Sequence, residues 1–257
     1  MAAALRIGCV KSLNAQPLIF GWPGDVVFAD PAALCQHLSD GELDVALVSS
    51  FEFLRNPIYT IVDGVAVASA GPVYSVFLAH TEALEEIDEI VLDPASKTSV
   101  NLLRCLLAER HLRPCLITAK QSDEAPTTGC AQLMIGDQAI AFRQRADRKM
   151  RFWDLAEAWR EATGLPFVFA LWLIRPEVRD AAQIAKRLRA LRDENLRSLG
   201  AVIEGQRDFP ANFCAYYLRD CLRFRFAEAE KAGLLRFRSL CENHGILPPN
   251  PAPLRLA

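Results

Sequence analysis

Two patterns of hydrophobic and polar positions alternate along the first two thirds of the chain. Short apolar runs, typical of buried strands, lie at 6–10, 26–30 and 44–50 and at the start of 89–99. Leucines at helical spacing fill 31–43 and 99–112. This strand–helix–strand order predicts a parallel α/β sheet.

The remaining apolar segments extend this picture and then change it. Further strands are predicted within 64–81, where Gly71-Pro72 separates two runs, and over 114–120, 131–142 and 165–174. From about residue 177 the pattern is wholly helical, with one apolar stripe through Ile184, Leu188, Leu191, Leu196, Leu199 and Ile203 and two more helices over 209–222 and 227–245. The residues alone therefore predict an open α/β sheet followed by a helical tail.

Composition excludes several classes of protein. A 257-residue chain with 51% hydrophobic residues fits one large domain or two lobes, and its net charge of -2 gives no reason to bind nucleic acid or an anionic membrane. The eight cysteines contain no CxxC pair, and the histidines lack metal-ligand spacing. We expect free thiols in a reducing compartment, no metal and no cofactor. The N-terminus resembles no signal peptide and the longest apolar run is too short to cross a bilayer, so we expect a cytoplasmic protein.

Three polar loops follow predicted strands, at 11–16, 49–52 and 93–99. Ligands of open parallel sheets bind beyond the carboxyl ends of the strands, which makes these loops the candidate site. Ser96, Thr98 and Ser99 precede a strong helix, where hydroxyls and free N–H groups suit a carboxylate or a phosphate. Simple N-capping needs one such residue and three are present, which favours an anion site.

Four other side chains have two interpretations each. Asn14 could bind a substrate or fold back in an Asx-turn, and Ser75 is a satisfied core hydroxyl unless its strand lines a cleft. Glu52 could be a general base or cap a short helix. Asp137 could orient loops or cap the next element.

The remaining polar and aromatic residues favour structure over chemistry. No GxSxG elbow, Walker loop or GxGxxG motif is present, and no nucleophile–base pair is evident. Asp154, Glu157 and Glu161 are spaced for the solvent side of a helix. The aromatic side chains around them are predicted to lie in the core: Phe152, Trp153, Trp159, Phe167, Phe169 and Trp172.

Six segments resemble, in the same order, blocks of the MqnA-type chorismate dehydratases of the futalosine route to menaquinone. They are RIGCVKSLNAQPL, DVALVSSFEFL, GPVYSVFLA, LDPASKTSVNLLRCLL, LMIGDQAI and DLAEAWREATGLPFVFALW. The resemblance implies a two-lobed fold like that of type II periplasmic binding proteins, with a cleft between the lobes and a helical C-terminal region. It places residues 1–80 and 171–257 in one lobe and 81–170 in the other.

The resemblance also implies the reaction, which is removal of water from chorismate to give 3-[(1-carboxyvinyl)oxy]benzoate by a hydro-lyase. It further implies that the enolpyruvyl carboxylate of the substrate serves as the base. Two readings compete with this one. The first is a non-catalytic protein that binds a small carboxylate on the same fold. The second is the paralogous dihydroxynaphthoate synthase, which is expected to use a histidine that no candidate loop here provides.

Residue roles follow from the matched motifs. The resemblance gives Asn14 and Ser75 catalytic roles, because each matches a family residue expected to act on the substrate or to contact it. It gives substrate-binding roles to the hydroxyls at two strand-end loops: Ser49, Ser50, Ser96, Thr98 and Ser99. Ser12 stands where the family usually has an aromatic residue, which predicts an altered fit of the substrate.

Overall fold

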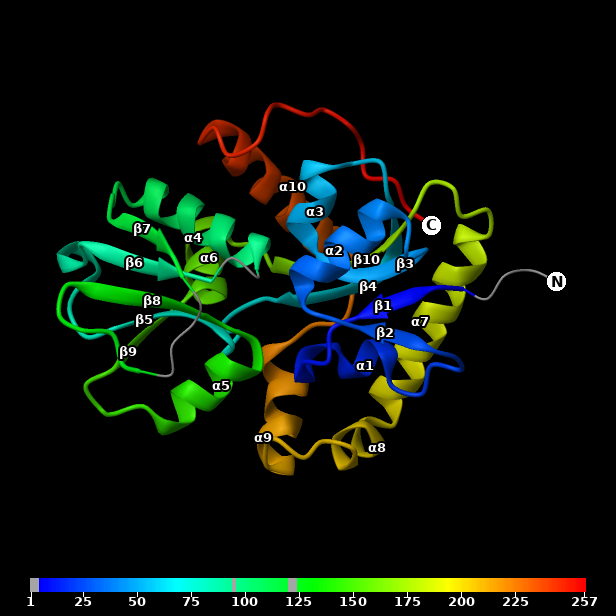
Figure 1. The fold of residues 1–257 in the computed structure, drawn as a ribbon, viewed down its shortest axis with the longest axis horizontal. Coiled ribbons are helices and arrows are strands. Elements are labelled where there is room, and N and C mark those ends of the chain that lie inside the picture. The colour runs from blue at the N-terminus through cyan, green and yellow to red at the C-terminus, as the bar shows by residue number, and fades with distance from the viewer. Residues whose placement is uncertain (1–4, 94–95, 120–123) are drawn as a thin grey trace.

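The apolar strands of the chain form two separate five-stranded sheets (Figure 1). The computed structural model describes residues 5–93, 96–119 and 124–257, so Pro94 and Ala95 of the predicted loop 93–99 lie outside the described residues. The first sheet has the order β2 (Val26–Phe28), β1 (Ile7–Cys9), β3 (Val45–Ser49), β10 (Phe167–Ile174) and β4 (Thr60–Ser69). The second has the order β7 (Cys115–Thr118), β6 (Glu89–Leu92), β8 (Cys130–Ile135), β5 (Val76–His80) and β9 (Arg151–Asp154).

The two sheets share one topology. In each, three strands are parallel, and a fourth runs antiparallel between them and an edge strand. That antiparallel strand is the one that the chain brings directly from the other sheet, which is β10 in the first sheet and β5 in the second. Both sheets are therefore mixed and not parallel throughout, because a strand that arrives from the opposite side enters in the reverse direction.

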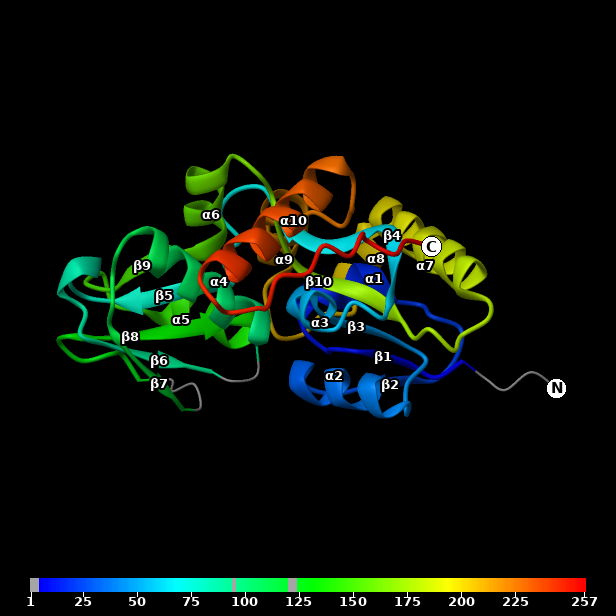
Figure 2. The same ribbon diagram turned by 90° about the horizontal axis from the view of Figure 1, so that it is seen from above.

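Helices cover both sheets and define two lobes (Figures 1 and 2). The first lobe carries α1 (Gln16–Ile19), α2 (Pro31–Asp40), α3 (Ser50–Arg55), α7 (Ala181–Arg197) and α8 (Leu199–Glu204). The second carries α4 (Lys97–Glu109), α5 (Gly136–Arg145) and α6 (Leu155–Thr163). Short 3₁₀ turns lie at η1 (Leu13–Ala15) and η2 (Leu84–Glu86).

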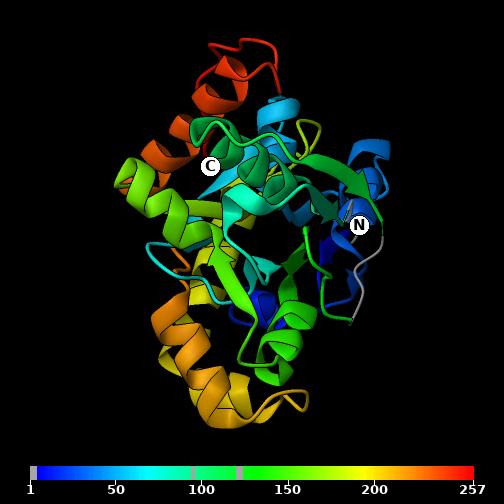
Figure 3. The same ribbon diagram turned by 90° about the vertical axis from the view of Figure 1, so that its left-hand side faces the viewer.

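The tail contains α9 (Ala211–Tyr216), a π-helical turn η3 (Tyr217–Cys221) and α10 (Glu228–Asn243). Figure 3 shows this tail, coloured yellow to red, along one side of the molecule. The helix α10 packs on both β10 and α4 and so bridges the lobes. Beyond it the chain returns to β4, where Ile61 N–H donates to Arg255 O at 2.8 Å.

Three predicted boundaries differ from the structure. The strand predicted over 131–142 ends at Ile135, and α5 begins at Gly136, whose φ of +67° suits glycine. The apolar stripe predicted as one helix is divided at Ser198 into α7 and α8. The lobe boundaries predicted at residues 80 and 171 do not coincide with the edges of the two sheets. All of β5 pairs in the second sheet, and all of β10 pairs in the first.

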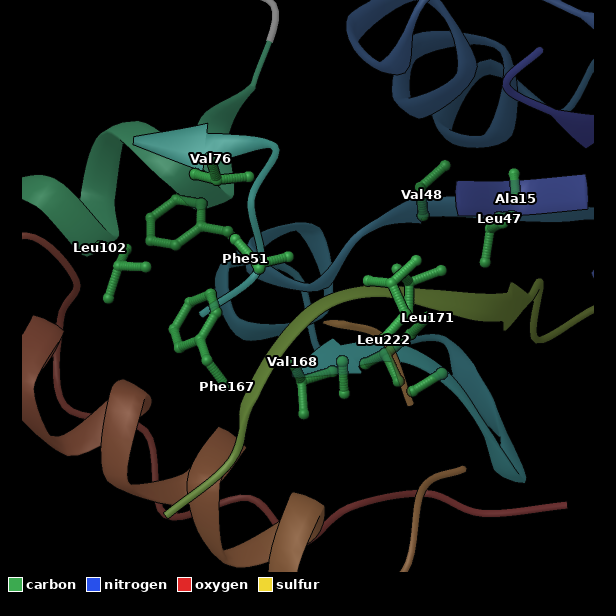
Figure 4. Packing of buried hydrophobic residues seen from close by; sticks show 14 of the residues in the cluster. Ala15, Leu47, Val48, Phe51, Val76, Leu102, Phe167, Val168, Leu171 and Leu222 are labelled. Carbon is green, nitrogen blue, oxygen red and sulfur yellow. The ribbon is translucent and has the colours of Figure 1, made fainter. Parts of the chain in front are cut away.

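The core continues from one lobe into the other. Phe51 of α3, Leu102 of α4 and Phe167 of β10 are buried and gather at the junction (Figure 4). Trp159, Trp172 and Phe167 are at most 1% exposed, which confirms the core assignment for these three aromatic residues. No helix within the described ranges combines the length and the apolar character needed to cross a membrane.

Candidate functional site

A cavity of about 640 Å³ lies between the lobes, where the carboxyl ends of the parallel strands of both sheets face each other. This volume falls within the range of small-molecule sites. The described residues that line it are Val10, Lys11, Ser12, Asn14, Phe28, Ala29, Asp30, Pro31, Leu47, Val48, Ser49, Val67, Ser75, Val76, Asp93, Ser96, Thr98, Ser99, Ile135, Gly136, Asp137, Gln138, Phe169, Ala170 and Asp208.

The structure brings six of the seven predicted site residues to this cavity. They are Asn14, Ser49, Ser75, Ser96, Thr98 and Ser99. Ser50 is fully buried instead, and its hydroxyl donates to Val168 O of β10 at 2.7 Å. Ser50 therefore fastens α3 to the strand that crosses between the lobes.

Asn14 lies in the 3₁₀ turn that follows β1, half-buried at the cavity wall. Ser12 Oγ donates to Asn14 Oδ1 at 2.7 Å. A primary amide has one oxygen and an NH₂ group with two donors, so this bond engages the oxygen and leaves the NH₂ donors of Asn14 for other partners.

Asp137 joins the two lobes across the cavity. Leu13 N–H of the first lobe donates to both carboxylate oxygens of Asp137, at 3.1 Å each. Burial raises the pKa of Asp137 to about 6, while the Leu13 N–H acts to lower it and the nearby Asp208 to raise it. The interpretation that this carboxylate orients a loop is the one that the geometry supports.

A set of hydroxyls forms a second connection between the lobes. Thr98, at the start of α4, lies beside Ser49 Oγ at 2.5 Å and accepts from Phe51 N–H at 3.1 Å. Ser96 caps α4, since its Oγ accepts from Ser99 N–H at 3.3 Å and donates to Ser99 Oγ at 2.9 Å. N-capping therefore holds for Ser96, and all three predicted residues at the start of α4 line the same cavity.

Glu52 has no place in the cavity lining. Its carboxylate is fully buried and pairs with Arg55 at 2.7 Å and with Lys97 at 3.9 Å. The carboxylate thus holds α3 against α4, and the geometry does not support the interpretation of Glu52 as a general base.

The crossing from β4 to β5 is held by a carboxylate that the sequence pattern assigned to solvent. Asp154 is 3% exposed and accepts from Tyr74 N–H at 2.8 Å and Val73 N–H at 3.0 Å. The same carboxylate caps α6 through Ala156 N–H at 3.1 Å. Tyr74 has a φ of +67°, and Arg143 lies over its ring at 4.3 Å. The prediction of an exposed Asp154 was wrong because Asp154 is the N-cap that precedes α6, so the helical spacing of polar residues does not apply to it.

Behind Ser75 stands a residue that sequence reasoning missed. Ser75 Oγ and Tyr217 Oη are 2.6 Å apart, although 142 residues separate them. Tyr217 is fully buried, and burial raises the pKa of its hydroxyl. The pattern over 209–222 signals only a helix, so nothing local in the sequence identifies this contact.

Fixed charge contributes little to the attraction of an anion. The charged groups among the described lining residues are Lys11 and four aspartates: Asp30, Asp93, Asp137 and Asp208. Lys11 is the one positively charged side chain among these described lining residues, and the other groups there that suit an anion are the hydroxyls and the N–H groups at the start of α4, which carry partial positive charge.

Comparison with known proteins places this site in a family context. A family model described as menaquinone biosynthesis matches residues 5–243. A chorismate dehydratase of Thermus thermophilus is 33% identical over 70% of this chain and 72% of its own length. A chorismate dehydratase of Campylobacter jejuni is 25% identical over 90% of each chain.

Solved structures agree on the fold. A protein from Archaeoglobus fulgidus aligns with a TM-score of 0.69 at 16% identity, covering 95% of this chain and 98% of its own. The periplasmic aliphatic sulphonate binding protein SsuA of Escherichia coli aligns at 0.66 with 14% identity, covering 97% and 95%. These likenesses support the two-lobed periplasmic-binding-protein-like fold.

Proposed function

Because the chain belongs to the menaquinone biosynthesis family, we propose that it is an enzyme that removes water from chorismate. The product is 3-[(1-carboxyvinyl)oxy]benzoate, and the step opens the futalosine-dependent route to menaquinone. One observation carries the proposal: Asn14 and Ser75, the two residues matched to family catalytic positions, line the same interlobe cavity as the hydroxyls at the start of α4.

The dehydration of chorismate requires few reactive groups from the protein. Loss of the ring hydroxyl and of one ring proton turns a cyclohexadiene into an aromatic ring, which drives the reaction downhill. A strong acid–base pair is then unnecessary, and the protein needs to hold two carboxylates and orient the departing hydroxyl. The proton acceptor carried by the family resemblance is the enolpyruvyl carboxylate of the substrate itself.

We assign contacts with the substrate to residues of both lobes. From the first lobe, the Asn14 amide donates to the substrate, and Lys11 supplies a positive charge. From the second lobe, Ser96 and Ser99 offer hydroxyls at the positive end of α4, and Ser75 contacts the reacting ring. Closure of the two lobes around the substrate would exclude water from these polar contacts.

The histidine-dependent paralogue fits this cavity less well. No histidine is present among the described residues that line it. His80, at the end of β5, uses its Nδ1 in a contact with Glu82 O at 2.7 Å. We therefore keep chorismate as the substrate and dehydration as the reaction.

The first experiment incubates purified protein with chorismate. It follows loss of the diene absorbance and measures the mass of the product. Formation of a product lighter by one water supports the dehydratase. Unchanged chorismate that nonetheless raises the thermal midpoint of the protein would instead support a carboxylate-binding protein on the same fold.

Asn14→Ala tests the assigned donor. We expect turnover to fall about 100-fold, as for loss of one preorganised donor in an active site, with the circular dichroism spectrum unchanged. Gln36→Ala, which removes an exposed amide on α2, is the control and should keep full activity. Wild-type kinetics in Asn14→Ala would remove Asn14 from the mechanism.

A further inference from the structure

The π-helical turn η3 places one tyrosine hydroxyl directly behind the cavity. Turns of this type are rare and occur frequently at functional sites. Tyr217 opens the turn, is 0% exposed and stacks on Phe213 with ring centroids 6.0 Å apart and 9° between planes. Its hydroxyl oxygen lies 2.6 Å from Ser75 Oγ, which faces the cavity.

The serine is fixed from its other side as well. Gly136 N–H donates to Ser75 O at 2.8 Å, so the backbone of this residue is tied to the start of α5. Both partners are buried, Ser75 being 1% exposed. Burial also keeps the tyrosine protonated by raising the pKa of Tyr217, so its hydroxyl has a proton to give.

A serine hydroxyl has one proton, and its direction decides what Ser75 can do. If Ser75 donated to Tyr217, it would have no proton left for a carboxylate or alcohol oxygen in the cavity. If Tyr217 donates to Ser75, the Ser75 proton is free to point at such an oxygen. Successive hydrogen bonds in this order polarise one another and strengthen the last donor.

We propose that Tyr217 is a positioning residue that donates to Ser75 Oγ and so directs the Ser75 hydroxyl proton toward an acceptor oxygen of the bound substrate. This inference rests on the proposed function, because it takes Ser75 as a contact to chorismate. It adds a residue from the helical tail, far from the matched sequence blocks in the first two thirds of the chain, to the machinery of the site.

The test is a double-mutant cycle with Tyr217→Phe, Ser75→Ala and the two combined. Each single variant should lower kcat/KM for chorismate about tenfold, the factor expected for one lost hydrogen bond. KM should rise in both, a change that a smaller folded fraction cannot cause. The double variant should match Ser75→Ala alone, because Tyr217 acts only through that hydroxyl. Tyr216→Phe, which removes the hydroxyl of a neighbouring residue that is 47% exposed, is the control.

The outcomes separate the inference from the proposed function. If the wild type converts chorismate but the fold-changes of the two single variants multiply in the double variant, the role of Tyr217 is overturned and the dehydratase stands. A Tyr217→Phe variant with unchanged kinetics has the same meaning. Binding without conversion overturns the dehydratase, and the cycle is then measured as Kd for chorismate by calorimetry, where the same loss of additivity supports the inference. A wild-type protein that neither binds nor converts chorismate overturns both. If Tyr217→Phe does not fold, Tyr217→3-fluorotyrosine, which keeps the shape and alters the donor, should shift KM only when Ser75 is present.

Discussion

Two side chains separated by one residue set the donor geometry at the first-lobe wall of the cavity. Ser12 Oγ donates to Asn14 Oδ1 at 2.7 Å, which holds the oxygen end of the amide against Ser12. The family resemblance predicted that Ser12 loses an aromatic wall. The structure shows that the same position gains a hydrogen bond to the residue matched as catalytic.

Ser12→Ala should therefore weaken catalysis without unfolding the protein. Loss of the bond lets the Asn14 amide rotate, and we expect kcat/KM to fall about fivefold to tenfold, as for one hydrogen bond. Ser12→Thr keeps the hydroxyl and should retain most activity. Equal activity in the alanine and threonine variants would show that Ser12 does not orient Asn14.

At the scale of elements, α10 shows how packing overrides helix propensity. Gly233 lies inside this helix, where glycine costs about 1 kcal/mol relative to alanine. A Cβ on Gly233 would lie 2.0 Å from Pro166 O, on the crossing that leads into β10. The glycine lets the helix approach the backbone that joins the two lobes.

Gly233→Ala should lower the free energy of unfolding by about 2 kcal/mol, because the clash exceeds the gain in propensity. Ala232→Gly, an exposed exchange one position earlier, should cost about 1 kcal/mol by propensity alone. Urea denaturation followed by circular dichroism measures both values. A stabilised Gly233→Ala protein would show that α10 can move off the crossing at no cost.

At the scale of the whole molecule, the hydrogen bonds from Leu13 N–H to the Asp137 carboxylate connect the two lobes. Burial raises the pKa of Asp137 to about 6, whereas an aspartate in the unfolded chain titrates near 3.9. Between these values the folded state binds a proton that the unfolded state does not. The contribution of Asp137 to the free energy of unfolding is therefore fully present below about pH 4 and is lost as pH rises through about 6.

Asp137→Asn removes this titration. The free energy of unfolding of the wild type, measured relative to this variant, should fall by about 2–3 kcal/mol between pH 4 and pH 7. Asp208→Asn removes only a neighbouring exposed charge and should keep most of the pH dependence. Parallel stability profiles for the wild type and Asp137→Asn would contradict the assignment. Urea titrations at several pH values supply the data.

Short-range patterns in the sequence predicted many of the strands, helices and polar loops of this molecule. Alternating apolar runs and helical leucines identified strands such as β1 and β3 and helices such as α2 and α4, because burial of one face imposes a local period. The polar loops at strand ends identified the hydroxyls of α4 and the loop that contains Asn14, since parallel strands bring their carboxyl ends to one edge. The role of Asn14 itself came from the family resemblance.

Tertiary structure decided the contacts that no local period encodes. The partners in Ser75–Tyr217 and Leu13–Asp137 lie more than 100 residues apart, so each pair meets only when the lobes are assembled. The same assembly turned Asp154 from a predicted surface residue into a buried cap and took Ser50 out of the site. Sequence by itself determined the elements and the loops that carry the chemistry. Only the folded chain determined which side chains hold those loops in place, because hydrogen-bond geometry depends on distances that the chain acquires on folding.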